Sequence, residues 1–408
     1  GMDVKAAEIT EDSLVAAEDT NVGNESVDIQ QQEPVEISEL ETTENNDLSK
    51  SSESITVDES IAEDILATQA DTAVVVGTVS DYLTAKGDAK LYNINLPAGV
   101  YLQAQLTTPA NADLDYDLYL LDAEGNILTG SDFYINIKGP AGTLPEALGY
   151  ITSGDTATYY LYVLASEGGS VSESFTLDYS VSTACDSYEI DESVRQALAF
   201  TYGAGGAYIE SRNLSSPIDN DWYVITVPSS RIYDKLKISA TTASTNTCSV
   251  EVYQNVASEG YQMKRVGSGN TISVSSGKYY IRVSNAKTME NFDDLDIQNY
   301  KLSITPILKA TGIVITDLKG SEGLNKVVNY PGYGAHFRTQ GSGTLTVYGV
   351  LTATDSSTGV TYAVGGEQIN GLYYSPAWEA NNTSANAIRR GTGTTDSSGK
   401  FEILFIYD

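Results

Sequence analysis

Clustered carboxylates are the side chains of this sequence that could do chemistry. Glu189 and Asp191 lie in one polar segment, and Asp219 and Asp221 follow further along the chain with one residue between them. Calcium takes about six to eight oxygen ligands, which carboxylates and backbone carbonyls supply. We therefore take these four residues as candidate calcium ligands. The alternative is that they are unconnected loop carboxylates of a very acidic protein.

A second acidic group occupies one face of a predicted strand. In the run 113–120, aspartates alternate with apolar residues, which is typical of a strand with one buried face. The aspartates are Asp113, Asp115 and Asp117, and the residues expected to pack inward are Leu114, Tyr116, Leu118 and Leu120. The aspartates are a second candidate metal site, although a solvated acidic face explains them equally well. Their spacing does not match an EF-hand loop.

The sequence offers little for catalysis. A nucleophilic triad needs a base, and the single histidine, His336, has no Gly-x-Ser-x-Gly motif nearby. One histidine and two cysteines are also a poor ligand set for zinc. Pairs of acids can hydrolyse glycosides, but 55 acidic residues provide such pairs without any specificity. We expect no enzymatic activity and assign no catalytic residue.

The cysteines leave two alternatives open. Cys185 and Cys248 are compatible with a disulfide in an oxidising compartment or with two buried thiols. Cys248 alternates with Val250 and Val252, so its side chain is expected to face a core, where an unreactive thiol is common.

Aromatic residues supply candidate binding surface. The chain has 28 tyrosines and two tryptophans, and aromatic faces can stack on sugars or pack against proteins. Tyr373, Tyr374 and Trp378 lie in an irregular Gly- and Asn-rich stretch and are the candidates for an exposed aromatic patch. Packing in a core is the alternative use of the same residues.

The charge balance excludes some partners. Asp and Glu number 55 against 23 Lys and Arg, a net charge of −32, so nucleic acid and anionic membrane surfaces would repel the chain. No stretch approaches the roughly 20 apolar residues that a membrane span requires, so we expect no membrane insertion. Nothing in the sequence predicts an oligomeric state.

The composition divides the chain into an acidic linker and a β-rich remainder. Residues 1–70 contain no aromatic residue and only Lys5 and Lys50 as basic residues, so they are predicted to be a disordered, self-repelling linker. From Ala73 onward, short alternating runs of Tyr, Val, Ile, Leu and Thr are punctuated by Gly, Asn and Asp. That pattern indicates antiparallel strands.

An internal repeat predicts two related modules. The segment 89–99 resembles 220–230, 116–125 resembles 249–260, and 159–163 resembles 279–283, in the same order. A closing strand follows the third match in each copy, at 174–181 and 299–305. The repeat predicts β-sandwiches at 71–183 and 184–307.

The remaining residues, 308–408, do not repeat the pattern. Probable strands at 312–318, 343–353, 361–364 and 400–407 indicate a third sandwich, immunoglobulin-like or transthyretin-like. The fold class is therefore all-β, with tandem jelly-roll-like or immunoglobulin-like sandwiches after a disordered acidic N-terminal segment.

The second module resembles a known family, the bacterial pre-peptidase C-terminal (PPC) domain. The resemblance rests on its opening segment 186–197, on the segment 219–223 and on Gly277-Lys-Tyr-Tyr-Ile-Arg-Val283; the first module is similar through 116–120 and 159–163. Together the similarity covers a little over half of the chain. It departs from the family at Ile190-Asp191, where Pro-Asn is usual, which weakens the inference of calcium.

The resemblance implies a secreted jelly-roll-like sandwich, an accessory module of extracellular enzymes and adhesins. It also implies that the segment with Glu189 lies along the edge of the strand after Asp219, so that the candidate calcium ligands converge. We predict a non-enzymatic, extracellular or cell-surface adhesion protein that binds a polysaccharide or a protein. The alternatives are an accessory region of an extracellular hydrolase, such as a protease or glycosidase, and a purely structural spacer.

Overall fold

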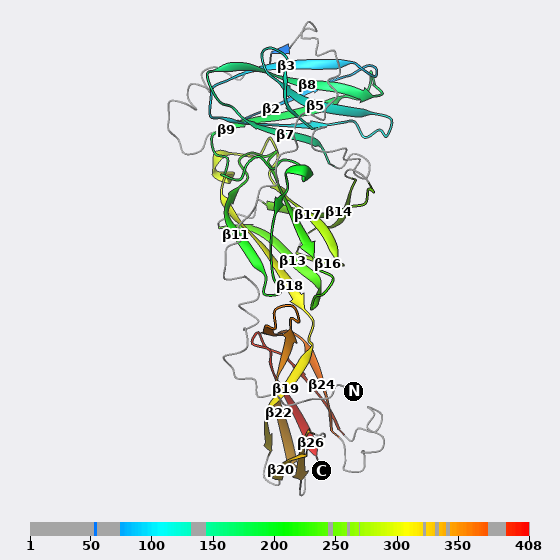
Figure 1. The fold of residues 1–408 in the computed structure, drawn as a ribbon, viewed down its shortest axis with the longest axis vertical. Coiled ribbons are helices and arrows are strands. Elements are labelled where there is room, and N and C mark those ends of the chain that lie inside the picture. The colour runs from blue at the N-terminus through cyan, green and yellow to red at the C-terminus, as the bar shows by residue number, and fades with distance from the viewer. Residues whose placement is uncertain are drawn as a thin grey trace.

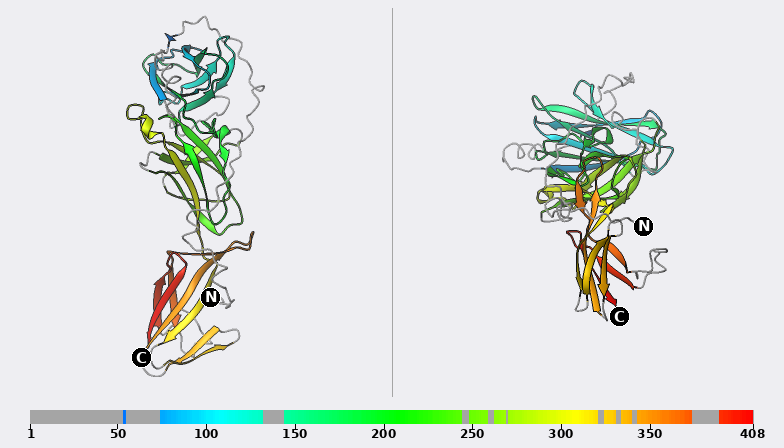
Figure 2. Two further views of the ribbon diagram at one scale, coloured as in Figure 1. Left: turned by 90° about the vertical axis from the view of Figure 1, so that its left-hand side faces the viewer. Right: turned by 60° about the horizontal axis from the view of Figure 1, so that its bottom comes forward.

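The protein is a row of three all-β domains (Figures 1 and 2). The computed structural model describes residues 53–54, 74–131, 144–243, 248–258, 262–268, 270–320, 324–330, 334–339, 343–373 and 389–407. In Figure 1 the strands of the first domain run across the long axis, whereas those of the other two domains run roughly along it. The helices in the described residues are the short 3-10 turns η4 (Val194–Gln196) and η5 (Asp294–Asp296).

The first sandwich consists of two facing sheets. One has the order β1-β3-β8-β5-β6, and the other has the order β2-β9-β4-β7. The strands of the first sheet are β1 (Glu53–Ser54), β3 (Ala89–Leu96), β8 (Ala157–Glu167), β5 (Asp115–Leu121) and β6 (Ile127–Gly130). Those of the second sheet are β2 (Val74–Asp81), β9 (Phe175–Ser182), β4 (Tyr101–Thr107) and β7 (Glu146–Ile151).

The second sandwich has the same plan. Its sheets have the orders β10-β12-β17-β14-β15 and β11-β18-β13-β16. The first sheet contains β10 (Leu198–Ala199), β12 (Asn220–Val227), β17 (Gly277–Asn285), β14 (Cys248–Asn255) and β15 (Met263–Ser268). The second contains β11 (Ala207–Asn213), β18 (Asn299–Leu308), β13 (Tyr233–Thr242) and β16 (Thr271–Ser273).

The two sandwiches correspond strand by strand. The repeated segments found in the sequence become β3 and β12, β5 and β14, β8 and β17, and β9 and β18, each in the same place in its sheet. Even the two-residue strands match, because β1 pairs in parallel with β3 as β10 pairs in parallel with β12. Tyr92 opposite Glu53 therefore corresponds to Tyr223 opposite Leu198.

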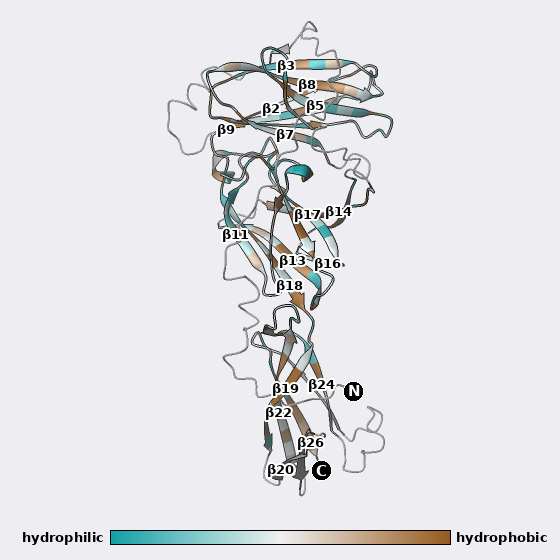
Figure 3. Cartoon of the chain, in the orientation of Figure 1, coloured by the Kyte–Doolittle hydropathy of each residue, from teal (hydrophilic) through white to brown (hydrophobic). Residues whose placement is uncertain are grey.

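Alternation along the strands places the cores between the paired sheets. Tyr116, Leu118 and Leu120 of β5 are fully buried in the first core, as expected from their shared side of the strand. Tyr223, Ile225 and Val227 of β12 have the same role in the second core. Figure 3 shows the resulting change between polar and apolar residues along the strands of both sandwiches.

The third domain is built around the long strand β22 (Gly343–Thr354). It pairs with β19 (Gly312–Gly320), β26 (Lys400–Tyr407) and β23 (Thr361–Ala363), which lie at the four strand positions expected from the sequence. Two hairpins complete the described part, β20 (Leu324–Tyr330) with β21 (Gly334–Thr339) and β24 (Gln368–Tyr373) with β25 (Arg389–Thr394). Phe401, Ile403 and Phe405 of β26 form its core with Leu345.

Two residues of the N-terminal segment depart from the linker prediction. Glu53 and Ser54 lie within the predicted linker, yet they form β1 and pair with Tyr92 and Asn93 of β3. Backbone pairing at a sheet edge needs no apolar side chains, so composition did not reveal it. The other residues of the predicted linker lie outside the described part of the chain. No helix in the described ranges has the length and apolar character needed to cross a membrane.

Candidate metal centre

The candidate calcium ligands meet at the end of the second sandwich that faces the first. The opening segment 186–192 runs beside the start of β12, where Trp222 N–H donates to the Asp191 carbonyl over 3.3 Å. Glu189, Asp191, Asp219 and Asp221 are all buried, the last three mentioned completely or nearly so. The structure therefore brings the four predicted carboxylates together, and it buries them.

Arg212 of β11 reaches into this group because of a β-bulge. The register of β11 against β18 shifts between Ile209 and Arg212, and Ser211 has a φ of 65°, in the left-handed region. An extra residue in a strand turns the following side chain to the opposite face. Ile209 and Arg212, three positions apart, consequently both point inward, and Arg212 is fully buried.

Arg212 neutralises one side of the acidic group. Its Nε lies 2.8 Å from Asp186, and its Nη2 lies 2.7 Å from Asp191 and 3.0 Å from Asp221. Its guanidinium also lies over the rings of Tyr188 and Tyr223, 5.3 Å from each centroid. Burial opposes the charge of Arg212, but Asp191 and Asp221 hold its pKa well above the usual value. This side of the group is thus a buried ion-pair network.

The other side has no such partner. Glu189, Glu192 and Asp219 offer ligand atoms that all lie within 4.8 Å of one another, and among the described residues no Lys or Arg forms an ion pair with them. A second set, Glu189 with Asp191 and Asp221, shares the same spacing. We call the six carboxylates around Arg212 the acid centre, namely Asp186, Glu189, Asp191, Glu192, Asp219 and Asp221.

Several buried oxygen atoms of the acid centre could accept a cation. Within the described structure, Glu189 Oε1, Asp191 Oδ1, Asp219 Oδ1 and Asp221 Oδ1 are buried without a hydrogen-bond partner. Leaving a buried charged oxygen unsatisfied costs several kcal/mol, so native proteins rarely do it without an ion or water. Hard carboxylate oxygens are the ligands that calcium prefers. The donor set of the acid centre therefore fits a divalent cation.

The protonation of the acid centre reflects the same shortage of positive charge. Burial, followed by the negative charge of Asp191, raises the pKa of Glu189 well above its usual range. Burial and Asp219 do the same for Glu192. The pKa of Asp219 is raised to about 7, again mainly by burial. Without a cation, these three carboxyls hold protons at a pH where exposed carboxyls are ionised.

The first sandwich completes the acid centre. The Tyr101 hydroxyl of β4 lies 2.9 Å from Glu189 Oε2 and 2.7 Å from Glu192 Oε1. The Gln103 amide donates to Glu192, and its carbonyl accepts hydrogen bonds from Ser180 at 3.0 Å and Ser216 at 2.6 Å. Both side chains are at most 1% exposed. The acid centre is therefore part of the joint between the first two sandwiches.

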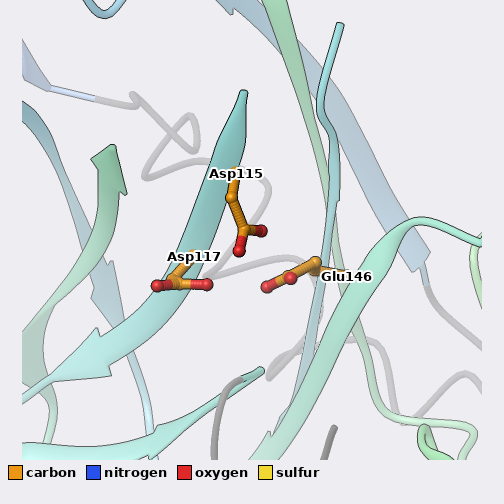
Figure 4. Close-up of side chains that lie close together, drawn as sticks. All are labelled: Asp115, Asp117 and Glu146. Atoms are coloured by element: carbon orange, nitrogen blue, oxygen red, sulfur yellow. The ribbon is translucent and has the colours of Figure 1, made fainter. Parts of the chain in front are cut away.

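The second predicted acidic group is rearranged. Asp115 and Asp117 of β5 come together with Glu146 of β7, their ligand atoms within 4.8 Å of one another (Figure 4). Asp113 precedes β5 and is not part of this group. The expected solvated face is wrong for Asp117, which is only 3% exposed. Its strand face is covered near Glu146, whose carboxylate accepts a hydrogen bond from Ser131.

The remaining predicted residues separate from the acid centre. Cys185 and Cys248 are both free thiols in the structure. Cys185 precedes the opening segment, whereas Cys248 begins β14 and faces the core of the second sandwich. Burial raises the pKa of the Cys185 thiol to about 11, so the thiol stays protonated at neutral pH. Tyr373 ends β24, and Tyr374 and Trp378 lie outside the described residues.

Several residues of the acid centre were missed in the sequence. Glu192 directly follows Asp191 and was overlooked as a ligand, although it is only 2% exposed. Arg212 carried no signal, because strict alternation from Ile209 places it on the outer face of the strand and only the bulge at Ser211 turns it inward. Tyr101 and Gln103 carried none, since their role depends on how one sandwich is placed on the next.

Comparisons with known proteins add little to this picture. No protein-family model matches the chain, and no curated protein sequence matches it. A periplasmic inhibitor of g-type lysozyme from Aeromonas hydrophila, PliG, is 10% identical over 32% of this chain and 96% of its own, with a TM-score of 0.19. The tandem CBM51 modules of the family 98 glycoside hydrolase Sp3GH98 from Streptococcus pneumoniae are 10% identical over 56% of this chain and 84% of their own, with a TM-score of 0.20.

The CUB1-EGF-CUB2 domains of rat MASP-1 are 10% identical over 56% of this chain and 97% of their own, with a TM-score of 0.18. At such TM-scores these likenesses carry no argument about function. The resemblance to the PPC domain stays a prediction from the motifs.

Proposed function

We propose that the chain is a non-enzymatic, extracellular or cell-surface protein that binds a polysaccharide or another protein through its row of sandwiches. The observation that supports this is the burial of the clustered acidic residues. Those that gather most closely, in the acid centre, are buried between strands rather than arranged around an open substrate site. Carboxylates in that position are suited to a structural role rather than to acting on a polymeric substrate.

The proposal includes calcium as the cation of the acid centre. Glu189, Glu192 and Asp219 would hold it, with Asp191 and Asp221 shared with Arg212. A bound calcium ion would supply positive charge to the oxygens that have no partner, and it would have a structural role. Carboxylates must be ionised to bind a metal, so calcium displaces the protons that Glu189 and Glu192 otherwise hold.

Calcium binding is tested by isothermal titration calorimetry of the chelator-treated full chain, with magnesium as the competing ion. We expect one calcium site that the double variant Glu189→Gln, Glu192→Gln loses. The matched control is the pair Asp115→Asn and Asp117→Asn, which alters the acidic group on the far side of the joint and should retain the site. Loss of binding in the control but not in the first variant would place the ion at Asp115 and Asp117 and contradict its assignment to the acid centre.

Ligand binding is tested by applying the purified chain to arrays of glycans and extracellular-matrix proteins, with calcium and with chelator. We expect at least one saturable ligand. If no glycan and no protein on the arrays binds, the alternative that the chain is a purely structural spacer is favoured. A hydrolysis product released from any glycan on the array would contradict the non-enzymatic assignment.

A further inference from the structure

The joint between the first two sandwiches is held by carboxylates of the acid centre itself. Tyr101 and Gln103 of β4 both reach Glu192, and Tyr101 also reaches Glu189. These are side chains of the first sandwich binding ligand candidates of the second. The orientation of the two carboxylates therefore determines whether the first sandwich finds its hydrogen-bond partners.

The hydrogen bonds of Tyr101 link the joint to the ionisation of the acid centre. A phenol has one proton and cannot donate to two carboxylates at the same time. Yet the Tyr101 hydroxyl lies within hydrogen-bond distance of Glu189 and of Glu192. If both carboxylates are ionised, they repel each other and one of them lacks a donor. An ion bound to both removes the repulsion and fixes their oxygens, as outer hydrogen-bond partners do around bound metals.

A narrow cleft at the joint reaches one of these carboxylates, Glu192. Ser131 and Glu146 of the first sandwich line it on one side, and Glu192, Ser193 and Asn220 of the second line it on the other. Its volume is about 20 Å³, enough for a water molecule or an ion but not for an organic ligand. The cleft thus connects the acid centre with the boundary between the two sandwiches.

We propose that a divalent cation in the acid centre locks the first sandwich onto the second at one angle, and that removing the ion frees this joint. The inference rests on the proposed occupancy of the acid centre by a metal. It adds a consequence that occupancy alone does not have, because a site within one sandwich could bind calcium without any effect on its neighbour.

The joint between the second sandwich and the third domain provides an internal control. Leu308, Leu351 and Val364 pack together there in an apolar cluster, and the Tyr362 ring lies close to Gly205. Apolar contact does not depend on an ion. This second joint is therefore expected to keep its geometry when calcium is removed.

The experiment measures distances between pairs of spin labels on the full chain, in calcium chloride and in chelator. The native thiols are removed by Cys185→Ala and Cys248→Ala. Labels at the exposed positions Ser153→Cys and Ser276→Cys span the first joint, and labels at Ser276→Cys and Ser357→Cys span the second. We expect calcium to narrow the distance distribution across the first joint and to leave the second unchanged.

Tyr101→Phe separates the joint from the metal site, because it removes one hydroxyl of the first sandwich and no carboxylate. We expect this variant to bind calcium in the calorimeter, yet to keep a broad distance distribution across the first joint in calcium. Tyr179→Phe is the matched control, a buried tyrosine of β9 opposite Ala104 of β4, and it should behave like the parent chain.

The outcomes distinguish the inference from the proposed function. A parent chain that binds calcium but has the same distance distribution with and without it would overturn the locking and leave the metal centre intact. A chain that binds no calcium would overturn both. An ion-dependent change across the second joint as well would show a general response of the chain and would also contradict the inference.

Discussion

The first and second sandwiches share every strand position, but one ion pair has its positive and negative residues exchanged between the two copies. In the first, Lys90 of β3 contacts Asp81 of β2 at 3.1 Å. In the second, the equivalent strands carry Asp221 on β12 and Arg212 on β11, 3.0 Å apart. The correspondence follows from the pairing, since Lys90 and Asp221 each stand two residues before the equivalent tyrosines Tyr92 and Tyr223.

The surroundings of the two ion pairs differ more than the pairs themselves. Lys90 and Asp81 are 33% and 20% exposed, whereas Arg212 and Asp221 are fully buried. A partly exposed pair needs no further partners because water completes its hydrogen bonds. A buried pair has to be completed by protein groups or ions. Both copies carry a pair of opposite charges at this point, and burial is what turns the second copy into a candidate metal centre.

Removing the positive charge should separate the two copies most strongly. Arg212→Met leaves Asp186, Asp191 and Asp221 buried without a counter-charge, which we expect to destabilise the chain by about 3–5 kcal/mol. The matched change Lys90→Met is expected to cost about 1 kcal/mol or less, because its pair is partly exposed. Denaturant unfolding in chelator measures both. Equal losses would show that the two pairs have the same role.

The pH dependence of stability should be opposite without and with calcium. The folded chain holds protons on Glu189, Glu192 and Asp219, whose pKa values are raised, while the unfolded chain releases them near pH 4. In chelator, the stability that these groups contribute is therefore present at low pH and falls as the pH rises toward the Asp219 value of about 7.

Calcium binds the ionised carboxylates, so in its presence stability should rise over the same interval. Thermal unfolding at pH 5 and pH 8, with and without calcium, gives the four midpoints needed. We expect the difference in pH trend between calcium and chelator to disappear in the double variant Glu189→Gln, Glu192→Gln. A midpoint that rises with pH in chelator would contradict the raised pKa values.

A smaller difference should come from the tyrosine next to the buried pair. Tyr300 of β18 donates to Asp221 and lies 2.6 Å from the Tyr223 hydroxyl, whereas the equivalent residue of β9 is Phe175. Tyr300→Phe removes one donor from the buried carboxylate of Asp221, which keeps its ion pair with Arg212, and we expect a loss of about 1–3 kcal/mol. Phe175→Leu, which removes no hydrogen bond, is the control for disturbed packing. Calorimetric unfolding measures the stability of the two variants. Equal losses would contradict a contribution from the Tyr300 hydrogen bond.

The smallest effect concerns the thiols. Neither sandwich is cross-linked, so a reducing agent should leave the unfolding midpoint of the full chain unchanged. The comparison is between thermal scans with and without dithiothreitol, with the double variant Cys185→Ala, Cys248→Ala as reference. A midpoint that falls on reduction only in the parent chain would show a disulfide.

The strands could be predicted from the sequence because their cause is local. Alternation around Tyr116 and the repeat of Tyr159-Tyr with Tyr279-Tyr reflect side chains that pack between two sheets, and each repeat carries that pattern in its own residues. The pairing of Glu189 and Asp191 with Asp219 and Asp221 depended on the resemblance, which places the opening segment beside a strand.

The remaining parts of the acid centre depend on features that no single segment contains. Arg212 points inward only because of the bulge at Ser211, and Asp117 lies beside Glu146 only because β7 packs near β5. Tyr101 reaches the acid centre from another domain. The sequence itself indicates that the first module begins with an acidic segment like that of the second. Glu44-Asn-Asn-Asp47 ends six residues before Glu53, and Glu189-Ile-Asp-Glu192 ends six residues before Leu198, the equivalent of Glu53.

The connection between β18 and β19 has a mechanical consequence. β18 ends at Leu308 and β19 begins at Gly312, so the backbone passes from one domain to the next almost without a loop. A pull on the far end would be transmitted along this nearly continuous strand instead of being taken up by slack chain. The lower two-thirds of the molecule should therefore act as a stiff lever, with any compliance concentrated where the first sandwich is seated.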